Sequence, residues 1–310
     1  MPASSFFKLP YILLFVSFAS ATIFSSAQLN AQSLSLDPDK LDIASLHAII
    51  YDVESDTELY SKNSDYVAPI ASITKLMTAM VTLDANLPLN ERISVEIKDV
   101  PEMRNVLTRI RIGSELSRQD LIRLAVMSSE NRAAATLAHH YPGGVAAFLG
   151  AMNAKAKTLG MNDTYFADPT GLSEHNRSSA RDLTKLVLAA RDYPLIREYS
   201  TTEKKDAFFT VPQYALAFYN TNPLIEKPEW EIILSKTGYI NEAGRCLVML
   251  VELGGRELAV VLLDSFGKYT HIGDAGRIRD WVETGTSGAV PQDALNYAAI
   301  RKVEKNLDSN

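Results

Sequence analysis

Cysteine is nearly absent from this chain of 310 residues, because Cys246 is the only one. A single cysteine excludes an internal disulfide bond and any zinc or iron–sulfur site that needs several cysteines. The histidines do not follow the HExxH pattern, and the two neighbours, His139 and His140, would point about 100° apart on a helix. We therefore expect neither a bound metal nor a cofactor.

A surplus of positive charge is also lacking. Lys and Arg number 31 against 37 Asp and Glu, which gives a formal net charge of −6. Proteins that bind nucleic acid by neutralising phosphates are usually basic, so this balance argues against that class. The GxGxxG and GxxxxGK[ST] patterns of nucleotide-binding loops and the GxSxG pattern of many serine hydrolases are missing too.

Acidic residues are absent from the first 27 positions, where Lys8 is the only charged side chain. An apolar run covers Tyr11–Phe24 and small residues follow, an order typical of a secretory signal peptide cut after Ala27. The alternative is an uncleaved anchor, but the run is shorter than the roughly 20 residues that a spanning helix needs. No cysteine lies near the cut, which excludes a lipoprotein. We expect an exported mature chain, Gln28–Asn310, without a membrane anchor.

The first two thirds of the chain predict one β-hairpin and then mainly helices. Apolar spacing and turn residues predict strands over His47–Glu54 and Thr57–Lys62, and helices over Ile70–Ala85, Ser117–Met127, Asn131–His140, Val145–Gly160 and Arg181–Asp192. Ser117 and Ser179 are placed to cap two of these helices, and Pro194 to end the last.

The C-terminal third is rich in β-forming residues. It predicts strands over Glu231–Ile240, Arg245–Leu253 and Arg256–Asp264, with Gly254-Gly255 as a tight hairpin, before a helical pattern returns at Ile278–Val282. Strands from both chain ends around a helical middle indicate an α+β fold. We expect an antiparallel sheet of about five strands flanked by helices, with a helical subdomain.

The tail, Asp293–Leu307, has apolar residues at helical spacing, but the stripe is incomplete and the charges are of mixed sign. Helices that lie on membranes usually carry a basic polar face. The pattern therefore favours a peripheral or weakly docked helix over a membrane anchor.

Ser72 and Lys75 form an SxxK pattern at the start of the first strong helix. Residues three apart lie on one helical face, so the serine Oγ and the lysine Nζ can meet. A serine becomes nucleophilic when a base takes its proton, and a lysine can be that base when its pKa is lowered. The pattern alone is weak, because Ser5–Lys8 and Ser265–Lys268 match it too.

Two further motifs fall where chemistry could use them. Ser129–Asn131 (SEN) lies at a break between two helices, where the serine could relay a proton and the asparagine could bind a substrate amide. Lys236–Gly238 (KTG) lies in a strand, where lysine supplies positive field, threonine binds a carboxylate and glycine admits a ligand backbone. The plain alternatives are a capping serine and a solvated lysine beside an ordinary strand glycine.

The three motifs together, in this order and on these elements, are far more specific than any one of them. From about His47 to Trp281 the sequence resembles the serine DD-peptidases of the low-molecular-mass penicillin-binding type. Asp168–Leu172 and Asn176–Asp182 resemble the family's segments on the floor and rim of the site. The resemblance implies a β-lactamase/transpeptidase-like fold and a periplasmic enzyme that acts on peptidoglycan stem peptides and is inhibited covalently by β-lactams.

The resemblance also implies roles for individual residues. Ser72 would attack the carbonyl of a penultimate D-alanine to form an acyl-enzyme, with Lys75 as its general base. Ser129 and Lys236 would help return a proton to the leaving amine. The backbone N–H groups of Ser72 and Tyr239 would form the oxyanion hole. The substrate-binding residues that it implies are Asn131, Lys236, Thr237, Gly238 and Tyr239.

Three other residues near the motifs are singled out. Arg245 is a candidate to bind an anionic group of the substrate, and the alternative is a structural ion pair with Glu242. Cys246 is expected to be a buried small apolar residue rather than a reactive thiol. Glu130 has no assigned role, and a solvent-facing position is the simplest expectation.

The resemblance leaves several activities open. Carboxypeptidases of this family usually continue into a β-rich domain and an amphipathic anchor, and little chain follows Gly238 here. The sequence therefore favours a DD-endopeptidase that cleaves D-alanyl–diaminopimelyl cross-links, with a D-Ala-D-Ala carboxypeptidase as the alternative. A class A β-lactamase is less favoured because its ExxxN motif is missing between SxN and KTG, and a non-enzymatic sensor because the motif side chains are intact.

These expectations divide the chain into four parts. Residues 1–27 are the expected signal peptide and residues 28–45 an N-terminal lead. Residues 46–284 are the expected catalytic domain, and residues 285–310 a C-terminal tail.

Overall fold

The computed structural model describes residues 1, 3, 36–104, 106 and 108–307. Apart from residues 1 and 3, the predicted signal peptide and its cut after Ala27 lie outside the described residues. The described residues from 36 onward belong to one compact unit that carries the fold.

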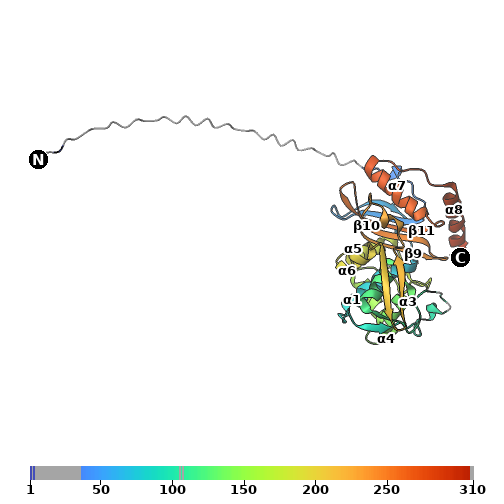
Figure 1. The fold of residues 1–310 in the computed structure, drawn as a ribbon. Coiled ribbons are helices and arrows are strands. Elements are labelled where there is room, and N and C mark those ends of the chain that lie inside the picture. Colours follow the sequence, from blue (N-terminus) through green and yellow to red (C-terminus); the bar gives the residue numbers. More distant parts are fainter. Residues whose placement is uncertain (2, 4–35, 105, 107, 308–310) are drawn as a thin grey trace. The chain divides into compact units, whose positions relative to one another are not determined.

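A five-stranded antiparallel sheet, in the order β2-β1-β11-β10-β9, forms the centre of this unit (Figure 1). Its strands are β1 (His47–Asp52), β2 (Thr57–Lys62), β9 (Glu231–Ile240), β10 (Gly244–Leu253) and β11 (Arg256–Ser265). β1 pairs with β11, so the two ends of the chain meet within the sheet. Gly254 and Gly255 have φ of +57° and +73° between β10 and β11, as a tight hairpin requires. The predicted sheet is confirmed.

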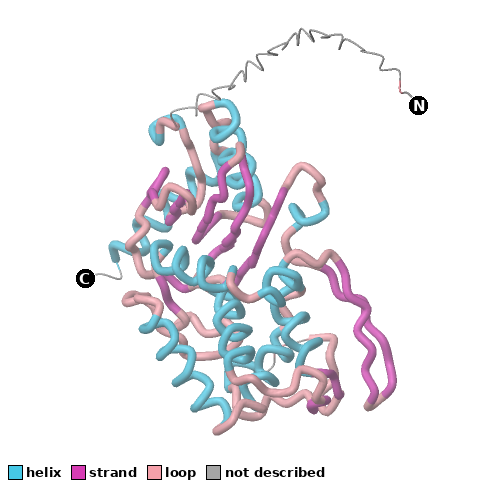
Figure 2. Tube along the Cα trace, turned by 90° about the vertical axis from the view of Figure 1, so that its left-hand side faces the viewer, coloured by secondary structure: helices cyan, strands magenta, loops and turns pink. Residues whose placement is uncertain are grey.

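Helices cover both faces of the sheet (Figures 1 and 2). Those on the larger, helical side are α1 (Thr74–Asp84), α2 (Arg118–Met127), α3 (Asn131–His139), α4 (Gly144–Thr158), α5 (Ala180–Arg191) and α6 (Pro194–Ser200). The opposite face is covered by α7 (Thr270–Thr284). Ile49, Val248 and Val261 belong to the core under the helical side. Alternate residues of the same strands pack with Ile278 and Trp281 of α7, because strand side chains alternate between faces.

The helix starts follow the predicted caps. The Ser117 hydroxyl accepts the N–H of Asp120 at 3.1 Å, and the Ser179 hydroxyl accepts the N–H of Asp182 at 3.2 Å. α5 ends before Pro194, as predicted, and Pro194 then opens α6, a position where the missing N–H of proline is harmless.

The sequence patterns did not predict two neighbouring strands. Strands β7 (Lys204–Thr210) and β8 (Gln213–Tyr219) form a separate hairpin that stands apart from the main sheet (Figure 2). Most of its residues are exposed or half-buried, so its apolar spacing is not that of a buried strand. The remaining short ladders pair β3 (Ala68–Pro69) with β6 (Arg177–Ser178), and β4 (Arg92–Ser94) with β5 (Glu115–Ser117).

The tail forms helix α8 (Gln292–Leu307), as its apolar residues at helical spacing predict. The Tyr297 hydroxyl donates to the Asp264 carboxylate at 2.5 Å and so docks α8 against the end of β11. Leu295 and Ile300 remain exposed. No helix within the described ranges is long and apolar enough to cross a membrane.

Candidate active site

Ser72 lies in a single turn of 3₁₀-helix, η2 (Ala71–Ile73), that leads directly into α1. Ala71, just before it, has φ of +47°, a conformation that L-residues seldom adopt. Strand β9 passes so close that a Cβ added to Gly238 would lie 3.0 Å from the Ser72 nitrogen. Glycine at this position of KTG therefore lets the strand edge approach the serine.

Lys75 joins the SxxK and SxN motifs. Its buried ammonium donates to the Ser72 Oγ at 2.8 Å, to the Asn131 Oδ1 at 2.8 Å and to the Thr170 carbonyl at 2.5 Å. Burial lowers its pKa to about 8, against the opposing pull of the Asp168 and Glu130 carboxylates. The geometry brings a serine hydroxyl within hydrogen-bonding distance of a lysine that loses its proton more readily than usual.

A loop through Asp168 and Asn176 packs beside Lys75 and supplies one of its hydrogen-bond acceptors. The buried Asp168 carboxylate accepts the N–H groups of Thr170, Gly171 and Ser173, the last two at 2.6 Å. The Asn176 amide donates to the Thr74 hydroxyl at 2.9 Å and ties the loop to α1. This internal bonding aims the Thr170 carbonyl at the Lys75 ammonium. The predicted Asp168–Leu172 segment thus reaches the site through its backbone.

The SxN residues lie at the junction of α2 and α3. Ser129 has φ of +58°, and Asn131 is the first residue of α3. Glu130 was expected to face solvent, but it is half-buried and caps α3 by accepting the N–H of Arg132 at 3.1 Å. Burial raises the pKa of the Glu130 carboxyl.

The KTG residues line the facing strand. Lys236 is buried and donates to the Thr237 carbonyl at 2.9 Å, and burial together with the Lys75 charge holds its pKa well below the ordinary value. The Thr237 hydroxyl donates to the Thr221 hydroxyl at 2.6 Å. The plain alternative for KTG, in which Lys236 is a solvated side chain, is therefore wrong.

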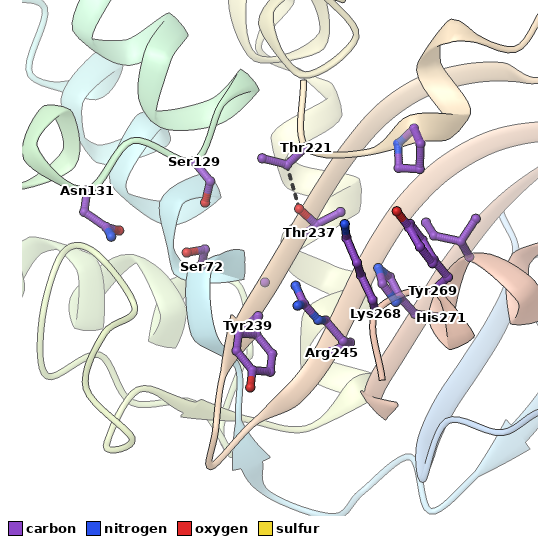
Figure 3. A pocket seen from close by; sticks show the side chains of 13 residues that line it. Ser72, Ser129, Asn131, Thr221, Thr237, Tyr239, Arg245, Lys268, Tyr269 and His271 are labelled. Atoms are coloured by element: carbon purple, nitrogen blue, oxygen red, sulfur yellow. Dashed lines mark hydrogen bonds between the residues drawn. The ribbon is translucent and has the colours of Figure 1, made fainter. Parts of the chain in front are cut away.

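These motifs open on one pocket of about 390 Å³ (Figure 3). Of the residues predicted for the site, those that line it are Ser72, Ser129, Asn131, Thr237, Gly238, Tyr239 and Arg245, whereas Lys75 and Lys236 are buried. The lining residues that the sequence did not single out as site residues are Thr221, Pro223, Lys268, Tyr269, His271 and Ile272. None of these six belongs to a motif, although Lys268 appeared in a chance SxxK match.

Arg245 faces the pocket, as expected. Its guanidinium lies 4.0 Å from the centroid of the Tyr239 ring, which stacks it beside the KTG strand. The ion pairs within the described part of the chain include none between Arg245 and Glu242, so that alternative is wrong. Cys246 is buried in the core, which confirms the expectation for it. The described residues contain no cluster of three His, Cys, Asp or Glu that could hold a metal ion.

A sequence model of the D-alanyl-D-alanine carboxypeptidase family matches residues 32–267. The chain belongs to this family. It is therefore a serine-type D-Ala-D-Ala hydrolase, a conclusion that agrees with the Ser72–Lys75 pair in the pocket.

Relatives place the chain within the family more finely. It is 56% identical over 256 residues to a D-alanyl-D-alanine endopeptidase of Escherichia coli strain K12, with 83% of each chain covered. It is 50% identical over 299 residues to a D-alanyl-D-alanine endopeptidase of Pseudomonas aeruginosa, with 96% of each chain covered.

Solved structures confirm the predicted transpeptidase-like fold. The DD-transpeptidase of Streptomyces K15 is 28% identical, with a TM-score of 0.72 over 79% of this chain and 98% of that one. Penicillin-binding protein D2 of Listeria monocytogenes, in its cefotaxime-bound form, is 28% identical, with a TM-score of 0.68 over 79% of this chain and 99% of that one.

Proposed function

We propose that this protein is a periplasmic DD-endopeptidase that cleaves D-alanyl–diaminopimelyl cross-links in peptidoglycan through an acyl-enzyme on Ser72. The observation that carries the proposal is the 50% identity to a D-alanyl-D-alanine endopeptidase over 96% of both chains. The motif set also resembles that of penicillin-binding protein 7, a periplasmic DD-endopeptidase.

The first step is attack by Ser72 on the donor D-alanyl carbonyl. With a pKa of about 8, Lys75 is partly neutral near neutral pH, and its free lone pair then accepts the Ser72 hydroxyl proton over the observed 2.8 Å separation. The Asn131 and Thr170 oxygens hold the lysine in place during this transfer.

Negative charge then develops on the carbonyl oxygen. We assign its stabilisation to the backbone N–H groups of Ser72 and Tyr239. The close approach of Gly238 to the Ser72 nitrogen supports this assignment, because it sets the two backbones side by side. The N-terminus of the following helix adds favourable field for a negative charge at Ser72.

The leaving amine needs a proton, and the substrate needs to be held. We assign proton return to Ser129, which lines the pocket, together with the buried Lys236 of β9. Asn131 binds the substrate amide, while Thr237 and Arg245 bind the carboxylate next to the scissile bond. Water then releases the acyl group from Ser72.

β-Lactams are the expected covalent inhibitors, because their lactam amide mimics the D-Ala-D-Ala bond and Ser72 would be acylated. Rapid lactam hydrolysis is disfavoured by the missing ExxxN motif. A non-enzymatic sensor is disfavoured by the intact hydrogen bond between Lys75 and Ser72. Within the chain, residues 46–284 would form the catalytic domain, after an N-terminal lead of residues 28–45 and before the tail of residues 285–310.

The alternative activity is D-Ala-D-Ala carboxypeptidation, favoured by the family's name and by a carboxypeptidase of Mycobacterium tuberculosis that is 29% identical over 75% of this chain. The mature protein should be incubated with dimeric cross-linked muropeptides and, separately, with pentapeptide monomers. Endopeptidase function predicts a larger kcat/KM for dimers. Release of terminal D-alanine without any dimer cleavage would favour the alternative.

A further inference from the structure

The active-site pocket extends beyond the KTG strand to the start of α7. Figure 3 shows Ser72, Ser129 and Asn131 on one side of Thr237, and Lys268, Tyr269 and His271 on the other. We call the wall formed by Lys268, Tyr269, His271 and Ile272 the α7 wall. None of these residues has a part in the mechanism above.

The charged side chains that line the pocket are all positive. Among its 13 lining residues, Arg245 and Lys268 are cationic and none is acidic. The Lys268 ammonium lies 5.1 Å from the centroid of the Tyr269 ring, and no ion pair of Lys268 is found among the residues that the structure describes. Its charge is therefore available to a ligand rather than consumed by the protein.

His271 supplies a second, independent sign of a missing partner. Its side chain is only 5% exposed, and within the described part of the chain its buried Nδ1 has no hydrogen-bond partner. Burial, followed by the charge of Arg245, lowers its pKa to about 4 against the pull of Asp274, so the ring is neutral near pH 7. Buried polar atoms in native proteins nearly always form hydrogen bonds. A ligand or a water that enters the pocket here would give the His271 Nδ1 its hydrogen-bond partner.

The first turn of α7 adds unpaired donors at the same place. Tyr269 is the N-cap and makes no capping hydrogen bond with its side chain. The helix of 15 residues therefore presents N–H groups without intrahelical partners, at its positive end, beside Lys268. Cation, neutral imidazole and helix N-terminus converge on one end of a pocket that contains no carboxylate of its own.

We propose that the α7 wall binds a second carboxylate of the leaving peptide, with Lys268 as the residue that selects cross-linked substrates. This inference rests on the proposed endopeptidase function. Thr237 and Arg245 take the carboxylate beside the scissile amide, so groups that lie farther along the pocket meet the leaving side. A released D-alanine ends at that first carboxylate. The acceptor stem of a cross-link continues through its diaminopimelyl arm to further carboxylates.

The test compares a long and a short ligand on matched variants. Lys268→Gln should lower kcat/KM for dimeric muropeptides about five-fold, mainly through KM, as expected for an ion pair worth about 1 kcal/mol. The same variant should acylate with benzylpenicillin at the wild-type rate, because that ligand has one carboxylate. Lys157→Gln, at an exposed lysine of α4, makes the same charge change away from the pocket and should alter neither rate.

Further variants separate charge from shape. Lys268→Arg should retain dimer cleavage, and Lys268→Glu should weaken it more than Lys268→Gln does. Equal loss of dimer cleavage and penicillin acylation in Lys268→Gln would overturn the proposal, since it would indicate a structural defect at Ser72. Unchanged dimer cleavage in Lys268→Gln would overturn it as well.

A binding measurement keeps this inference separable from the proposed function. In a Ser72→Ala background, the Lys268→Gln change should weaken dimer binding about five-fold, as for the same ion pair. This expectation does not depend on whether the wild type cleaves dimers. A protein that cleaves no dimers would therefore contradict the proposed function, whereas unchanged binding would contradict only the role of the α7 wall. Equal dimer affinity with and without Lys268 would contradict the inference.

Discussion

At the scale of single residues, Lys75 organises the site. One buried ammonium reaches the Ser72 hydroxyl, the Asn131 amide and the Thr170 carbonyl. The contact with Ser72 was predicted from the SxxK spacing. The contact with Asn131 was not, because the sequence indicated only a substrate-binding role for that residue. The third was not, because a backbone carbonyl leaves no trace in residue identity and depends on how Asp168 folds its loop.

The lowered pKa of Lys75 predicts the pH dependence of acylation. Only the neutral amine can accept the Ser72 proton, and its fraction rises as pH passes through about 8. The second-order rate of acylation by benzylpenicillin should therefore increase from pH 6 to a midpoint near 8 and then level off. Stopped-flow fluorescence or quenched mass spectrometry measures it. A flat profile across this range would contradict the role of Lys75.

Glu130 should tune that midpoint. Its carboxylate raises the pKa of Lys75, so removal of the charge should lower this pKa and shift the acylation midpoint to lower pH. Glu130→Gln retains an oxygen that can accept the Arg132 N–H, so α3 should keep its cap. Glu54→Gln, at an exposed carboxylate of the hairpin turn, serves as control and should leave the profile in place. A shift to higher pH in Glu130→Gln would refute the electrostatic account.

At the scale of elements, the site depends on three segments that approach closely: η2, β9 and the loop through Gly171. A Cβ on Gly171 would lie 2.0 Å from the Ala71 carbonyl oxygen, next to Ser72, the proposed nucleophile. Capped helices and the β10–β11 turn were predictable from local sequence, because serine caps and paired glycines act within a few residues. The β7–β8 hairpin was not, because most of its residues are exposed or half-buried, and apolar and polar residue types do not alternate strictly along either strand.

The contact at Gly171 predicts a paired outcome for two alanine substitutions. Gly171 and Gly160 both have positive φ, at +80° and +69°, so alanine strains the backbone at either position. Only at Gly171 does the added Cβ collide with the chain, because nothing lies within 4 Å of the Cβ position at Gly160. Gly171→Ala should lose both thermal stability and penicillin acylation, whereas Gly160→Ala should lose about 1 kcal/mol of stability and retain acylation.

Calorimetry and acylation kinetics measured on the same samples decide this prediction. Wild-type acylation in Gly171→Ala would show that the loop does not position the nucleophile.

At the scale of the whole molecule, the sheet separates two cores and the active site lies at its β9 edge. The sequence could predict that both chain ends form one sheet, because strand patterns occur only near the ends of a helical middle. It could not predict that the α7 wall meets the KTG strand, because residues 268–272 carry no motif and reach the pocket only through the packing of α7 on β10 and β11.

Separate cores predict that stability and chemistry can be uncoupled. Ile278 is fully buried between α7 and the outer face of the sheet, two turns from the pocket. Ile278→Ala should reduce the free energy of unfolding by about 2–5 kcal/mol, the usual cost of a large cavity. The folded variant should still be acylated by benzylpenicillin at the wild-type rate. Urea unfolding and acylation kinetics measure the two quantities, and a proportional loss of both would show that the cores are coupled.

The central claim is that Ser72 cleaves peptide cross-links, and purified cross-linked peptidoglycan tests it most directly. The mature wild-type protein and Ser72→Ala should be incubated with it, and the muropeptides separated after muramidase digestion. The account predicts that wild type converts dimers into monomers and that Ser72→Ala, with an unchanged melting temperature, leaves them intact. Dimers that persist with the wild type, or that disappear equally fast with Ser72→Ala, would contradict it.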